Sequence, residues 1–97
     1  MSMTKIASLS PSIATDHRRQ FWGRMFGDGI KASRERAGMS IAEAAGLSGM
    51  AVSEWMAIED GSVPQDVNRL RAMAAAIEVS YDQIATLALL CREAWEL

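Results

Sequence analysis

The chain has 97 residues, of which 49% are hydrophobic and 23% are charged, and its net charge is −2. This length predicts a single globular domain with a modest core. The longest apolar run, 84–91, is interrupted only by Thr86 and is far shorter than the roughly 20 residues that span a bilayer. No apolar signal-peptide core is visible, which predicts a cytoplasmic protein without a membrane partner. The single cysteine, Cys91, excludes an internal disulfide and a site built from several thiolates.

The charge is unevenly distributed along the chain. Residues 1–39 carry seven basic and three acidic residues, whereas residues 40–97 carry three basic and nine acidic residues. A molecule polarised in this way can present its basic end to an anion such as nucleic acid. Solvated helix faces of a soluble protein would give the same pattern, so the charge alone leaves both interpretations open.

The first element expected is a helix that follows a flexible N-terminal arm. Residues 1–15 are serine-rich and show no period, and a single helical domain is expected over residues 16–97. Thr15 or Asp16 can cap a helix that ends before Gly38. The three glycines at 23, 27 and 29 each cost a helix about 1 kcal/mol relative to alanine, which favours a break near residues 27–29. The apolar stripe of this helix consists of Phe21, Trp22, Met25, Phe26 and Ile30.

Four shorter helical segments follow, and no segment alternates as a strand would. Ser40 and Glu43 have the spacing of a capping box, which opens a helix of small residues that ends before Gly49. Further helices are expected over 51–60, 66–78 and from Ser80 to near the end, with a turn at Gly61 and Pro64. The sequence therefore predicts an all-α protein. Its expected core residues are Trp55, Ile58, Leu70, Met73 and Ile77.

Residues 40–60 have the pattern of a helix–turn–helix. This motif needs a small residue in its first helix, a glycine in its turn and a bulky apolar residue in its second helix. Ala45, Gly49 and Ile58 supply these three, and the small Ala44 and Ser48 leave room for the large Trp55.

The wider chain, from residue 27 to 84, resembles the phage-repressor/Cro type of helix–turn–helix protein, the xenobiotic-response-element family. The stretches that carry this resemblance are "GDGIKASRERAGMS", "SIAEAAGLSG", "EWMAIEDG" and "LRAMAAAIEVSYDQI". The resemblance implies a compact five-helix, lambda-repressor-like domain with an N-terminal arm and an extended C-terminal helix. It also implies a structural ion pair between Arg34 and Glu59, which would hold the first helix against the third.

The same resemblance implies a sequence-specific transcriptional regulator, most often a repressor, that binds double-stranded DNA as a homodimer through the major groove. The positions that would contact bases are Val52, Ser53, Glu54 and Ala57. Those that would contact phosphates are Ser40 and Ile41 at a helix start, and Ser62 and Gln65 in the following loop. The chain departs from the family at Ile41, where glutamine is usual, and in the loop after Gly61, which has no basic residue. Phosphate contacts are therefore also expected from Arg18, Arg19, Lys31 and Arg36.

A second class of function is a protein-interaction module on the same fold, such as an antirepressor, an antitoxin-like protein or a subunit of a complex with a second protein. The acidic half and the uncharged loop favour it. No nucleophile–base pair, phosphate loop or metal-ligand spacing is present, so we expect no enzyme activity, cofactor or metal, and we interpret His17 as a surface residue.

The last helix extends beyond what the fold needs, and its apolar surface predicts a homodimer interface. In the alternative interpretation, Trp95 folds back onto Phe21 and Trp22 within one chain. The expected dimerisation residues are Leu87, Leu90, Cys91, Ala94 and Trp95.

Overall fold

The computed structural model describes the backbone of residues 11–96 and the side chains of residues 17–92. The described chain is all-helical, as predicted, and contains five helices and no strand. The helices are α2 (Pro11–Arg36), α3 (Ile41–Leu47), α4 (Val52–Glu59), α5 (Val67–Ala76) and α6 (Tyr81–Glu96). None of them is both long and apolar enough to cross a membrane.

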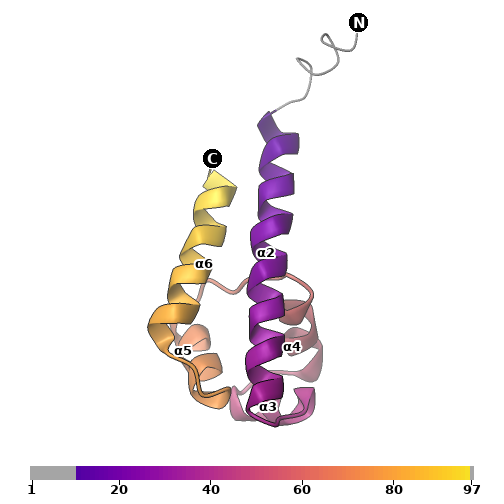
Figure 1. Cartoon of the computed structure of the whole chain (residues 1–97), viewed down its shortest axis with the longest axis vertical. Helices are drawn as coiled ribbons and strands as arrows, with labels where there is room; N and C mark the ends of the chain where they lie inside the picture. The colour runs from indigo at the N-terminus through magenta and orange to yellow at the C-terminus, as the bar shows by residue number, and fades with distance from the viewer. Residues whose placement is uncertain (1–10, 97) are drawn as a thin grey trace, which may run out of the picture.

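The two long helices, α2 and α6, lie side by side and run in opposite directions (Figure 1). The three short helices gather at the end of this pair where α2 finishes and α6 begins. There α4 contacts α2, α3 contacts both α4 and α5, and α5 contacts α6. Of the three short helices, α4 thus packs directly on α2, while α3 is held by α4 and α5, and α5 is held by α6.

Helix α2 differs from the sequence prediction in two ways. It begins at Pro11, inside the segment expected to be an arm, because proline suits the first turn of a helix. Residues 1–10 lie outside the described part of the chain. The helix also continues without a break through the three glycines. A Cβ on Gly23 would lie 2.5 Å from the Gly61 carbonyl oxygen, and one on Gly27 would lie 2.4 Å from that of Glu59. These two glycines thus let the backbone of α2 approach the end of α4.

The helix–turn–helix turn closes on Gly49. This residue has a φ of 69°, and the Met50 amide reaches back to the Ala45 carbonyl oxygen over 2.9 Å. Glycine adopts this left-handed conformation without steric cost. At the end of α5, Glu78 adopts the same conformation with a φ of 59°, and it is the one non-glycine residue that does so in the described chain.

The core lies where the five helices meet. The five predicted core residues are all buried: Trp55 and Met73 are 0% exposed, and Ile58, Leu70 and Ile77 are between 2% and 4% exposed. Ala44 and Ala45 on α3 are buried too, and their small side chains leave the volume that Trp55 fills. The predicted apolar stripe of α2 is only partly inside: Phe26 and Ile30 are buried, whereas Phe21 and Met25 remain exposed.

Candidate nucleic-acid interface

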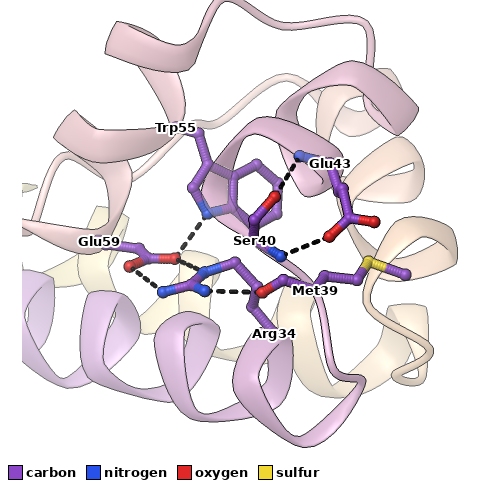
Figure 2. A network of polar contacts seen from close by, with 6 residues as sticks. All are labelled: Arg34, Met39, Ser40, Glu43, Trp55 and Glu59. Atoms are coloured by element: carbon purple, nitrogen blue, oxygen red, sulfur yellow. Dashed lines mark hydrogen bonds and ion pairs between the residues drawn. The ribbon is translucent and has the colours of Figure 1, made fainter.

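Arg34 joins three parts of the fold through a buried polar network (Figure 2). Its Nε donates to Oε2 of Glu59 over 2.6 Å and its Nη2 donates to Oε1 over 3.1 Å, so the pair is bidentate. Its Nη1 donates to the Met39 carbonyl oxygen over 2.8 Å, and the Trp55 indole N–H donates to Oε2 of Glu59 over 2.6 Å. Arg34 on α2 and Glu59 on α4 are the two residues expected to pair. Together the contacts fix the orientation of α4 against α2 and the start of α3.

The network also sets the charge state of its members. Burial raises the pKa of the Glu59 carboxyl, but hydrogen bonds from Arg34 and Trp55 and the positive charges of Arg34 and Lys31 outweigh it. The net pKa of Glu59 is therefore below its usual value. The hydrogen bond to Glu59 raises the pKa of Arg34 in turn. The pair is ionised at neutral pH and hydrogen-bonded on both sides, as a buried ion pair must be to persist.

The expected capping box opens α3. The Glu43 amide donates to the Ser40 hydroxyl over 3.1 Å, and the Ser40 amide donates to the Glu43 carboxylate over 2.9 Å (Figure 2). The hydrogen bond from the Ser40 amide, followed by that of its hydroxyl, lowers the pKa of Glu43. Ile41 packs against the core. Two of the amides at this helix start are thus already used, and a carboxylate stands beside them.

Helix α4 presents an exposed face opposite its buried side. Trp55 and Ile58 point into the core, whereas Val52 (45% exposed), Ser53 and Ala57 are accessible. Met56, which sequence reasoning missed, is 49% exposed on the same helix. An exposed methionine in a short helix with core residues on both sides carries no sequence signal of its own. The face is mainly apolar and has one hydroxyl group.

Glu54 is exposed on α4, but both its carboxylate oxygens have partners within the chain. The Ala51 amide donates to Oε1 over 3.2 Å, and Nη1 of Arg69 on α5 pairs with Oε2. The side chains of Glu54 and Arg69 remain 44% and 39% exposed. Sequence reasoning did not identify Arg69. The sequence feature that could have indicated Arg69 is that it is the first basic residue after Arg36.

The residues expected at phosphates are scattered. Arg18 and Arg19 are exposed on the N-terminal half of α2, beyond the turn where Gly23 meets the end of α4. They are not brought together with Lys31 and Arg36, which are exposed near the end of the same helix. In the loop after α4, Ser62 is exposed, and the Gln65 side-chain amide donates to the Ala88 carbonyl oxygen of α6 over 3.1 Å. Gln65 therefore ties this loop to α6.

The residues of the expected dimer surface on α6 differ in their exposure. Cys91 is 1% exposed and lies in the core of the single chain, where burial raises the pKa of its thiol. Leu87 and Leu90 are partly exposed, and Leu89, which was not expected, is 50% exposed. The expected residues Ala94 and Trp95 lie outside the described side chains, as does the alternative contact of Trp95 with α2.

Comparison with known proteins supports the motif. A family model described as a helix-turn-helix domain matches residues 26–87. This range contains α3, α4 and α5 together with both partners of the Arg34–Glu59 pair. No curated protein and no solved structure matches the chain. The matched range covers more than half of the sequence, and the chain belongs to the helix-turn-helix domain family.

Proposed function

We propose that the chain is a sequence-specific DNA-binding regulator that acts as a repressor and places α4 in the major groove of duplex DNA. One observation carries the proposal: α4 is fixed on its inner side by Trp55, Ile58 and the Arg34–Glu59 pair, while its outer face stays open. A rigid helix with one accessible face is what the second helix of a helix–turn–helix offers to a groove.

The chemistry of this face favours contacts of modest polarity. The Ser53 hydroxyl can donate to or accept from a base edge, and Val52 and Ala57 can pack on a thymine methyl group. Such a face discriminates mainly by shape and by the methyl groups of the major groove. Glu54 belongs to the same surface, but both its carboxylate oxygens already have partners within the chain.

Positive charge near the groove would come from the flanks of α4. Lys31 and Arg36 are exposed on the C-terminal part of α2, and Ser62 follows α4. Backbone amides at Ile41, next to Ser40, could face a phosphate, although the neighbouring Glu43 weakens that site. Arg18 and Arg19 would contact phosphates only farther along the duplex.

The homodimer is the second part of the proposal. An open groove of about 590 Å³ runs between α2 and α6, and Phe26, Ile30 and Leu87 contribute to its apolar lining. Leu89 and Leu90 lie farther along α6, and Phe21 and Met25 lie farther along α2. We propose that a second copy of the chain covers this surface. Sedimentation at micromolar concentration should show a dimer, and Leu87→Glu should shift it to the monomer.

The deciding experiment is an unbiased selection of duplex DNA by the purified protein. Enrichment of two half-sites about 10 base pairs apart, or a multiple, supports the dimeric major-groove mode. Ser53→Ala should then weaken binding to the selected site, by less than the roughly 1–3 kcal/mol that a bidentate base contact contributes.

A protein-interaction module remains a second candidate because one observation favours it. No lysine or arginine occurs from residue 37 to residue 68, a range that holds Glu43, Glu54, Glu59, Asp60 and Asp66. Glu59 is buried in its pair with Arg34, but the other four acids are exposed, and an acidic surface of this kind repels phosphate and suits a basic protein partner. A folded dimer that enriches no duplex sequence in the selection would favour this candidate over DNA binding.

A further inference from the structure

Arg69 stands at the N-terminal end of the α4 face although it belongs to α5. Its Nη1 pairs with Oε2 of Glu54, in the first turn of α4. The start of α5 is itself fixed, because the Asn68 amide donates to the Asp66 carboxylate over 2.8 Å. The 32 residues before Arg69 contain no other cation. Arg69 therefore brings a positive charge to the start of α4, a helix that has no basic residue of its own.

The Glu54–Arg69 pair contributes little to the stability of the fold. Both side chains are more than a third exposed, and exposed ion pairs contribute at most about 1 kcal/mol to folding. Arginine has five N–H donors in a planar fork, so the contact of one terminal nitrogen with Glu54 leaves donors for an anion. The pair orients the guanidinium and leaves it accessible.

Glu54 in turn has little capacity left for a base. Oε1 accepts from the Ala51 amide, where it caps the start of α4, and Oε2 faces Arg69. To accept a hydrogen bond from a cytosine amino group in place of either partner, it would have to give up the cap or the ion pair. Its two contacts link the start of the exposed helix to the start of α5.

We propose that Arg69 binds a DNA backbone phosphate at the edge of the groove that α4 enters, and that Glu54 positions Arg69 and does not read a base. The inference rests on the proposed DNA-binding function. Residues at the rim of a groove-inserted helix meet the sugar–phosphate backbone, and arginine matches the geometry of phosphate oxygens. Arg69 thus supplies a phosphate contact that the loop after α4 lacks.

The test uses the full chain, a salt titration of binding to the selected and to a scrambled duplex, and two conservative variants. Arg69→Gln should weaken binding to both duplexes by the same factor and flatten the slope of log K against log salt by about 0.9 per protein copy. Glu54→Gln keeps an oxygen for the Ala51 amide, so the preferred base at every position should stay unchanged. Arg71→Gln is the matched control, since Arg71 lies on the same helix with its guanidinium 5.2 Å from the centre of the Tyr81 ring. It should leave the slope as in the wild type.

Two outcomes would overturn the inference while the DNA-binding function stands. In the first, Arg69→Gln leaves the salt slope unchanged, as Arg71→Gln does, while Ser53→Ala still weakens the selected site. In the second, Glu54→Gln changes the preferred base at one position, for example toward the adenine that glutamine recognises. If the wild-type protein enriches no duplex at all, the proposed function itself fails and the inference fails with it. Thermal melts of the variants exclude unfolding as the cause of any loss.

Discussion

Replacing Arg34 with alanine should unfold or strongly destabilise the domain and not merely weaken DNA binding. The change removes two hydrogen bonds from Glu59, of 2.6 and 3.1 Å, and one from the Met39 carbonyl oxygen. Glu59 keeps only the Trp55 indole N–H, and its side chain is 8% exposed. Removing one partner of a buried ion pair typically costs about 3–5 kcal/mol because the other charge remains buried.

This cost can be measured by thermal melting. For a domain of 60–100 residues, each kcal/mol lowers the melting temperature by roughly 4–8 °C, so a loss of about 3 kcal/mol predicts a fall of at least roughly 12 °C. Circular dichroism in the far ultraviolet would follow the loss of helix. Arg36→Ala is the control, since Arg36 is exposed two residues farther on and should change stability by no more than about 0.5 kcal/mol. An Arg34→Ala protein that melts within a degree or two of the wild type would refute the reasoning.

The stability of the same variant should also depend on pH with a sign opposite to that of the wild type. In the wild type the pKa of Glu59 is below its usual value, so the stability from this group is present at neutral pH and is lost as pH falls through the lowered pKa. Without Arg34, burial is the dominant influence and raises the pKa of Glu59. Protonation of Glu59 then stabilises the Arg34→Ala variant. Urea titrations from neutral to acid pH should therefore show the free energies of unfolding of the two proteins converging. A constant difference across this range would contradict the assignment of the cost to a buried carboxylate.

The remaining predictions concern single residues. Gly27→Ala should destabilise the domain by about 1–3 kcal/mol, because its Cβ would lie 2.4 Å from the Glu59 carbonyl oxygen. Gly29→Ala should stabilise the domain by up to about 1 kcal/mol, because no atom lies within 4 Å of the added Cβ. Urea titrations measure both changes. Glu78→Gly should stabilise by about 1 kcal/mol, since it relieves a left-handed backbone. Cys91 should react with a thiol reagent only after unfolding, because it is 1% exposed and burial raises its pKa; rapid labelling of the folded protein would show that α6 detaches.

Local signals in the sequence were sufficient for the capping box of α3 and for the turn between α3 and α4, but not for the start of α2 or for the central ion pair. Ser40 and Glu43 are three residues apart and form the capping box through atoms that the spacing alone brings together. Gly49 takes the left-handed turn that a helix–turn–helix requires. The Arg34–Glu59 pair, 25 residues apart, was predicted only through the resemblance to a family, since no periodicity connects α2 to α4.

The glycines of α2 show what local signals leave out. Gly23 and Gly27 were interpreted as weak points because their cost to an isolated helix is visible in the sequence. Their partners, the carbonyl oxygens of Gly61 and Glu59, lie more than 30 residues away and become neighbours only when α4 packs on α2. The Glu54–Arg69 pair was missed for the same reason, because it depends on how α5 is placed against the start of α4.

The spacing of the cations along α2 limits which of them can act together on DNA. At a rise of about 1.5 Å per residue, Arg18 and Arg36 lie about 27 Å apart along the helix axis. This is more than two Debye lengths at 0.1 M salt, where the Debye length is about 10 Å. Within one chain, Arg18 therefore cannot assist at a phosphate that Arg36 and Lys31 would contact beside α4 in the proposed complex. Charge changes at Arg18 and at Arg36 should then alter the salt slope additively, and the Arg18 contribution should vanish on a duplex trimmed to the bases that α4 covers.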